Sequence, residues 1–131
     1  AMTGPLLVLL VEDEPLNTKL MRAVLEAAGF VVIHAGTGRD GITLARERRP
    51  DVILLDIGLP DIDGVRTLRH LRERPETCTT PVAAVTAQAM KGDRERLLAA
   101  GFDDYMAKPI DVQALPGDVR RLAARGAAEA E

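Results

Sequence analysis

The chain has 131 residues, a length that suits a single domain able to bury a hydrophobic core of its own. Its formal net charge of −3 argues against a nucleic-acid-binding protein, and the lone Cys78 excludes an internal disulfide or a cysteine metal cluster. The longest apolar run, residues 6–11, is too short to span a membrane and lacks the basic flank of a secretion signal. We therefore expect a cytoplasmic domain over residues 5–125, preceded by an N-terminal extension over residues 1–4 that resembles a cloning remnant.

The chain opens with a strand followed by a helix. Residues 6–11 are all apolar, a pattern typical of a strand buried on both faces, and they run directly into Glu12 and Asp13. Pro15 suits the first turn of a helix, and Gly29 suits its end. Apolar residues recur every four positions in this helix and predict its buried stripe: Leu16, Leu20, Val24 and Ala28.

The next elements lead to the most apolar strand of the chain. Residues 30–33 predict a second strand, and Thr37 is the expected cap of a helix that Pro50 ends. Residues 52–55 are apolar and bounded by turn formers, which is typical of a central parallel strand. Asp56 follows at its carboxyl end, where open α/β sheets bind their ligands.

The second half of the chain repeats the alternation. Asp63 is the expected N-cap of a third helix, which ends before Pro75. Residues 81–86 predict a fourth strand that ends at Thr86. The helix expected at about residues 92–100 contains only two large apolar residues, Leu97 and Leu98, so it should dock lightly on the sheet.

A fifth strand and a last helix complete the pattern. Residues 104–107 predict the strand, and Lys108 follows it directly. The last helix should begin at Pro116, bury Val119, Leu122 and Ala123, and give way to a frayed tail over residues 126–131. Strands that alternate with helices at these spacings predict an α/β, doubly wound, five-stranded parallel sheet with helices on both faces.

Polar residues follow four of the predicted strands and should meet at one edge of the sheet: Glu12, Asp13, Asp56, Thr86 and Lys108. Three carboxylates a few ångströms apart resist ionising together, and a divalent cation resolves their repulsion. An all-oxygen site with room for water suits Mg²⁺, while a hydroxyl and an ammonium suit phosphoryl oxygens.

This ordered set resembles the response-regulator receiver domain of two-component phosphorelay systems over nearly the whole chain. The motifs that carry the resemblance are Glu12-Asp13, Asp56 with Leu59-Pro60, Asp63-Gly64, Thr86-Ala87 and Lys108-Pro109. The fold of that family is flavodoxin-like, which agrees with the predicted alternation of strands and helices.

The resemblance implies a role for each matched residue. Asp56 is implied as the phosphoacceptor, and Pro109 as a structural residue. The implied ligands of Mg²⁺ are Glu12, Asp13, Asp56 and the backbone carbonyl of Gly58. The residues implied to hold the phosphoryl group or to switch with it are Thr86, Ala87, Lys108 and Tyr105. Tyr105 is the only tyrosine of the chain, so a packing role stays as open as a switch role.

The function implied is a signalling phosphoacceptor that assists its own phosphorylation and dephosphorylation but turns over no external substrate. Its expected phosphodonor is a histidine kinase or a histidine phosphotransfer protein, and its expected output is a protein-interaction surface, with a phosphorylation-dependent dimer as one form. We expect no nucleic-acid or membrane partner. His34 and His70 have no matching partners in the sequence and are expected to be structural or surface residues.

Two alternatives stand beside this interpretation. One is a phosphorylation-independent interaction module, against which the intact set of acids, threonine and lysine argues. The other is a Mg²⁺-dependent phosphohydrolase resembling the haloacid-dehalogenase class, which needs a second acid where this chain has Gly58. Whether the domain stands alone or belongs to a hybrid kinase or larger regulator stays open.

Overall fold

The computed structural model describes residues 4–87 and 90–130, and its centre is one parallel sheet. The strands lie in the order β2-β1-β3-β4-β5, so that β3 is in the middle. Their bounds are β1 (Leu7–Val11), β2 (Val31–Ala35), β3 (Val52–Asp56), β4 (Val82–Thr86) and β5 (Asp104–Ala107). Val8 of β1 pairs with Val32 on one side and with Val52 on the other. The predicted fold class is therefore confirmed.

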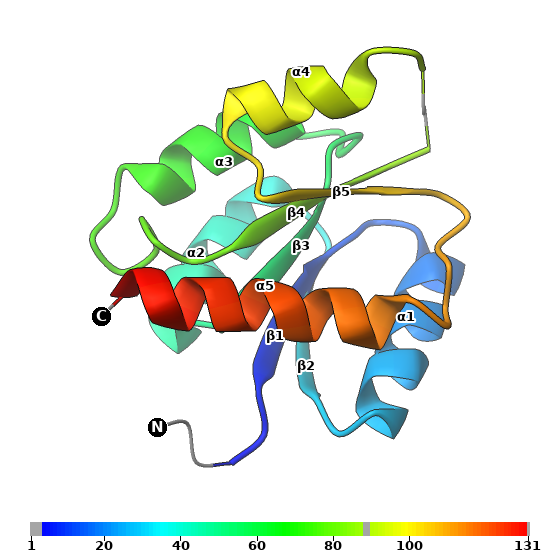
Figure 1. Cartoon of the computed structure of the whole chain (residues 1–131). Coiled ribbons are helices and arrows are strands. Elements are labelled where there is room, and N and C mark those ends of the chain that lie inside the picture. Colours follow the sequence, from blue (N-terminus) through cyan, green and yellow to red (C-terminus); the bar gives the residue numbers. More distant parts are fainter. Residues whose placement is uncertain (1–3, 88–89, 131) are drawn as a thin grey trace.

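Helices cover both faces of this sheet (Figure 1). Their bounds are α1 (Pro15–Ala27), α2 (Gly38–Arg48), α3 (Gly64–Arg72), α4 (Asp93–Ala100) and α5 (Leu115–Ala130). One half of the core joins the sheet to α1 and α5, and the other half joins it to α2, α3 and α4. Among the described residues, none of these helices combines the length and apolar character that crossing a bilayer requires.

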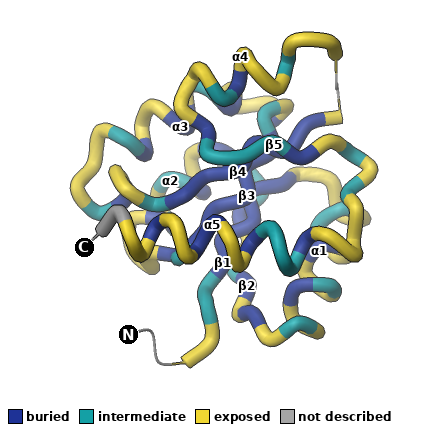
Figure 2. The backbone as a smooth tube through the Cα atoms, in the orientation of Figure 1, coloured by how far each residue is buried: buried dark blue, intermediate teal, exposed yellow. Residues whose placement is uncertain are grey.

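The central strand is as buried as its sequence predicts. Every residue of β3 is buried, and Ile53, Leu54 and Leu55 are fully inaccessible. Figure 2 shows the same contrast across the molecule, with dark blue strands inside and largely yellow helix surfaces outside. Because helices shield both faces of a doubly wound sheet, apolar residues on both sides of β3 are stabilised by burial.

The predicted buried stripe of α1 is wrong for its first two residues. Leu16 is 75% exposed and Leu20 is 45% exposed, whereas Met21 and Leu25 are buried against the sheet. The helix carries apolar residues on more than one side, and the sequence period does not say which side meets the sheet. Contacts of Met21 and Leu25 with the α1–α5 half of the core decide it.

Two other elements differ from the sequence prediction at their ends. Strand β2 occupies Val31–Ala35 rather than residues 30–33, with Phe30 buried just before it. Helix α5 begins at Leu115 and continues to Ala130, although we expected a frayed tail after residue 125. Gly126 is buried, and a Cβ there would lie 2.6 Å from the ring of Pro81. Gly126 of α5 therefore packs closely on Pro81, the residue before β4.

The loop after β3 folds back onto its own beginning at Gly64. A Cβ at this position would lie 2.5 Å from Ile57 Cγ2 and 2.6 Å from Ile57 Cα, so only glycine fits. The N–H of Gly64 donates to the carbonyl of Ile57 at 3.2 Å. Asp63 then caps α3 as predicted, accepting a hydrogen bond from the N–H of Arg66 at 2.9 Å. The loop that follows Asp56 is thus held at both ends.

Candidate functional site

Three carboxylates meet where β1 and β3 end, as the sequence predicts. Glu12 and Asp56 are buried, with 1% and 6% of their surface exposed, while Asp13 is exposed to solvent. One carboxylate oxygen from each of the three lies within 4.8 Å of the others. They are brought together because β1 and β3 are adjacent parallel strands whose carboxyl ends share one edge of the sheet.

Lys108 reaches into this acidic cluster from the end of β5. Its Nζ lies 2.8 Å from Glu12 Oε1 and 3.1 Å from Asp56 Oδ2. Its backbone N–H donates to the carbonyl of Thr86 at 2.8 Å, which fixes the chain beside β4. The peptide bond to Pro109 is cis. This partly buried ammonium therefore neutralises part of the charge of the two buried acids.

Backbone donors orient the two buried carboxylates. The N–H of Gly58 donates to Asp56 Oδ1 at 2.9 Å, and the N–H of Glu14 donates to Glu12 Oε2 at 3.0 Å. His34 Nε2 of the edge strand β2 lies 2.8 Å from the backbone carbonyl oxygen of Glu12 and so contacts the main chain of this residue. The sequence analysis assigned no role at the site to His34 or Glu14, because a contact to a backbone carbonyl or from a backbone N–H leaves no pattern in the sequence.

Burial and charge act on the pKa values of this cluster in opposite directions. Burial raises the pKa of Glu12 above its ordinary value of 4.5, and contacts with Lys108 and the N–H of Glu14 reverse only part of the effect. For Lys108, burial lowers the pKa, but contacts with Glu12 and Asp56 outweigh it and bring the pKa above 10.5. Lys108 is therefore a permanent cation at neutral pH.

The acidic cluster fits a divalent cation. Glu12 Oε1 is buried and accepts no hydrogen bond of acceptable geometry, so its contact with the Lys108 ammonium is an ion pair alone. Asp13 is exposed, which leaves one side of the cluster open to water. Carboxylate oxygens with access to water are the ligands that Mg²⁺ prefers.

The remaining predicted site residues lie on β4 and β5. Thr86 is buried at the end of β4, next to β3, and Ala87 after it is exposed. Tyr105 of β5 pairs in register with Ala84 and is half-buried against the half of the core that joins the sheet to α2, α3 and α4. Because side chains alternate along a strand, Thr86 and Tyr105 share the sheet face that α2, α3 and α4 cover. The structure therefore supports packing by Tyr105, and its switch role stays a prediction.

Asp61, which sequence reasoning did not single out, joins the loop after β3 to α2. Its Oδ1 accepts a hydrogen bond from the N–H of Gly38 at 2.9 Å, and its Oδ2 accepts one from Arg39 at 3.0 Å. These two N–H groups belong to the first turn of α2, where helical partners are missing. The hydrogen bond from Gly38, and then that from Arg39, hold the pKa of Asp61 below its ordinary 3.8.

The lowered pKa of Asp61 predicts a pH-dependent contribution to stability. A carboxyl with a folded-state pKa below its unfolded one stabilises the fold above pH 3.8, and this contribution is lost as the pH falls through the folded pKa. We expect Asp61→Ala to lower the melting temperature by a few degrees at pH 7 and by much less at pH 2.5. An equal loss at both pH values, measured by circular dichroism, would contradict the capping role.

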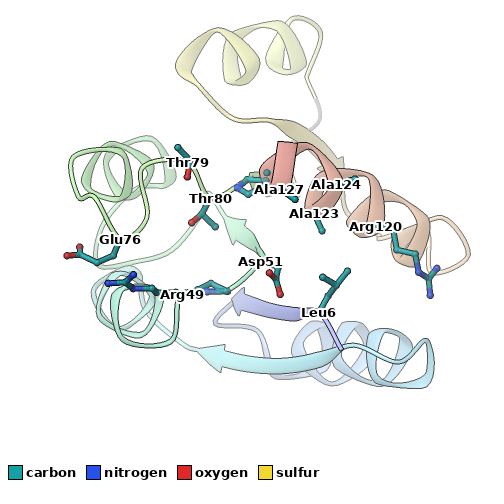
Figure 3. A pocket seen from close by; sticks show the side chains of 13 residues that line it. Leu6, Arg49, Asp51, Glu76, Thr79, Thr80, Arg120, Ala123, Ala124 and Ala127 are labelled. Atoms are coloured by element: carbon teal, nitrogen blue, oxygen red, sulfur yellow. The ribbon is translucent and has the colours of Figure 1, made fainter. Parts of the chain in front are cut away.

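A hollow of about 590 Å³ lies at the edge of the sheet opposite the acidic cluster, where the strands begin (Figure 3). Asp51 precedes β3 there, whereas Asp56 ends the same strand, so this hollow is separate from the acidic site. Alanine residues of α5 form one wall. The charged residues around this hollow are Arg49, Asp51, Glu76 and Arg120. Because two are cations and two are anions, their charges balance and do not favour a charged ligand.

Comparison of the sequence with known proteins identifies its family. Residues 8–120 match the family model described as the response regulator receiver domain. The chain is a member of that family. The polar-differentiation response regulator DivK of Brucella anthropi is 46% identical over 108 residues, which cover 82% of this chain and 88% of DivK. DivK of Brucella ovis is also 46% identical, over 80% of this chain and 85% of that protein.

Solved structures agree with the family assignment. A putative response regulator from Chloroflexus aurantiacus is 31% identical, with a TM-score of 0.87 over 92% of this chain and 99% of that chain. The receiver domain of a sensor histidine kinase from Pseudomonas aeruginosa is 36% identical, with a TM-score of 0.84 and the same coverage. The latter structure holds a magnesium ion coordinated in its active-site cleft.

Proposed function

We propose that this receiver domain accepts a phosphoryl group on Asp56 in a Mg²⁺-dependent reaction and thereby changes a protein-interaction surface in two-component signalling. The observation that carries the proposal is the placement of Asp56. This buried carboxylate lies close to two further acids and to a partly buried ammonium, at the end of the central strand. Burying a charged carboxylate costs free energy, and such buried charges are often found at functional sites, which supports a chemical role for Asp56.

The residues around Asp56 suit transfer from a phosphohistidine. A carboxylate oxygen of Asp56 forms the new O–P bond while the N–P bond of the donor breaks, and the donor imidazole leaves with the electron pair of that bond. Lys108, now 3.1 Å from Asp56 Oδ2, is close enough to follow the phosphoryl oxygens. Thr86 at the end of β4 supplies a hydroxyl, and the backbone of Ala87 is the next polar group along the chain.

The proposed metal ligands are Glu12, Asp13, Asp56 and the backbone carbonyl of Gly58. Bound Mg²⁺ supplies positive charge that offsets the phosphoryl oxygens and the clustered carboxylates. Asp13 is the exposed member and meets solvent directly, whereas Glu12 already contacts Lys108. We therefore propose that Asp13 contributes more to metal affinity than Glu12 does.

A metal titration tests this ligand set. We expect Mg²⁺ to bind with a Kd on the order of millimolar, because few protein ligands face an open, hydrated site. Asp13→Asn removes one anion and should weaken Mg²⁺ binding by about tenfold, together with the Mg²⁺-dependent uptake of beryllofluoride. Asp40→Asn, an exposed acid of α2, is the matched control. Unchanged binding in Asp13→Asn, followed by NMR, would refute the assignment.

The proposed output passes from Thr86 to Tyr105 and α4. Thr86 and Tyr105 share one face of the sheet, and α4 buries only Leu97 among its residues, so this helix is lightly anchored. A phosphoryl group that attracts the Thr86 hydroxyl changes the space beside Tyr105. The surface around Ala87, Met90 and Tyr105 then changes shape, provided that the phosphoryl group binds one arrangement better than the other.

Amide hydrogen exchange with and without beryllofluoride tests this route. We expect protection to change within α4 and at Tyr105 as well as in the loop after β3, since both regions adjoin Thr86. The α1–α5 half of the core serves as the internal control and should exchange as before. Changes confined to the loop after β3 would mean that the signal leaves by another surface. No Mg²⁺-dependent response at all would favour a phosphorylation-independent module.

The phosphodonor that we propose is a histidine kinase or a histidine phosphotransfer protein. The exposed Leu16 and Leu20 of α1 support a protein donor, because they form an apolar surface directly after the acids Glu12 and Asp13. The downstream partner is another protein, and a second copy of the domain is one candidate for it.

A further inference from the structure

A groove between α3 and α4 is rich in arginine. The hollow measures about 390 Å³, and its charged lining is dominated by the guanidinium groups of Arg66, Arg69 and Arg96. Arg66 and Arg69 make no side-chain hydrogen bond or ion pair within residues 4–87 and 90–130. Arg96 makes only a 3.4 Å contact with Asp93, and 58% of its side chain is exposed.

The folding of α3 explains why these cations face outward together. The core takes the opposite side of the helix, where Thr67, Leu68 and Leu71 are buried. Arg66 and Arg69 lie three positions apart in the helix, about one turn, so they are neighbours on its solvent side. A concentration of positive charge on a chain with a net charge of −3 runs against the sign of the molecule. Such a patch attracts anionic groups by long-range steering.

The floor of the groove is apolar. Ile57 and Val65 line it and are half-buried, so apolar side chains of an occupant can reach them. We propose that this groove docks an acidic amphipathic segment of a partner protein. Carboxylates spaced one turn apart on such a segment match Arg66 and Arg69, Arg96 faces them from α4, and the apolar side of the segment covers Ile57 and Val65.

A small phosphate-bearing ligand fits this groove less well than an acidic segment does. Phosphate sites at helices use the N–H groups of the first turn, and in α3 those of Gly64 and Arg66 already have acceptors. The N–H of Gly64 donates to Ile57, and that of Arg66 donates to Asp63 Oδ1 at 2.9 Å.

NMR titration of the isotopically labelled full chain, unphosphorylated and without metal, tests the proposal separately from phosphorylation. The probe is a synthetic helical peptide with glutamates one turn apart beside leucines. We expect amide shifts at Val65, Arg69 and Arg96, and no shifts with a peptide that carries glutamine in place of glutamate. Shifts that are the same with both peptides, or the absence of shifts with the acidic one, would overturn the proposal.

Paired variants separate specific docking from general attraction. Arg66→Gln/Arg69→Gln should weaken binding roughly tenfold, because each exposed pair contributes a factor of a few. Arg39→Gln/Arg48→Gln removes the same charge from exposed positions of α2 and should keep the affinity within about twofold. Equal losses of peptide affinity in the two double variants would overturn the proposal. Tighter binding of pyrophosphate to the same amides would also overturn it, in favour of a phosphate ligand.

Discussion

An Asp56→Asn variant is expected to lose phosphorylation entirely when the protein is incubated with acetyl phosphate and Mg²⁺. The carboxylate is the nucleophile in the proposed reaction, and an amide oxygen carries too little charge to replace it. The substitution also removes one of three anions that lie within 4.8 Å of one another, so metal affinity should fall at the same time. Mass spectrometry of the intact protein measures the added phosphate, and peptide mapping locates it.

Asp61→Asn is the matched control for this experiment. Asp61 lies in the same loop, five residues after Asp56, and its exposed carboxylate serves α2 rather than the acidic cluster. An amide at position 61 keeps an acceptor oxygen for the cap, so labelling should match that of the native chain. Undiminished labelling of Asp56→Asn would assign the phosphoryl group to a different residue.

A Lys108→Met variant is expected to be destabilised by about 3 kcal/mol in the absence of divalent metal, because removing the partly buried ammonium leaves the buried Glu12 carboxylate uncompensated. Lys108 and Glu12 expose only 14% and 1% of their side chains, so water cannot replace the ammonium fully. Added Mg²⁺ should restore more stability to the variant than to the native chain, since metal and ammonium offset the same charge. Urea unfolding in EDTA and in Mg²⁺ measures both effects.

A second substitution separates lost charge from lost packing. Glu12→Gln/Lys108→Met removes both charges, and the amide that replaces the Glu12 carboxylate keeps an oxygen that can accept the N–H of Glu14. The double variant should therefore recover much of the stability that Lys108→Met loses in EDTA. If the double variant is as unstable as the single one, the cost lies in the packing of the lysine stem. If Lys108→Met unfolds at the same urea concentration as the native chain, the ion pair contributes nothing.

The alternation of elements could be read from the sequence because each carries a local signal. Apolar runs such as residues 52–55 are typical of buried parallel strands, and Asp63 and Thr37 cap α3 and α2 as expected. Parallel strands joined by helices bring their carboxyl ends to one edge, which is why Glu12, Asp13, Asp56, Thr86 and Lys108 could be placed at one site. This part of the prediction depends on sequence order alone.

The sequence by itself determined the fold class and the membership of the acidic site, whereas the side of α1 that is buried was decided only in three dimensions. Leu16 and Met21 are both apolar, and a helical period cannot rank two apolar sides of one helix. The supports from His34 to Glu12 and from Asp61 to α2 also connect residues 22 or more positions apart. Such contacts depend on strand order and loop path, which no local pattern encodes, and packing of the whole chain selects them.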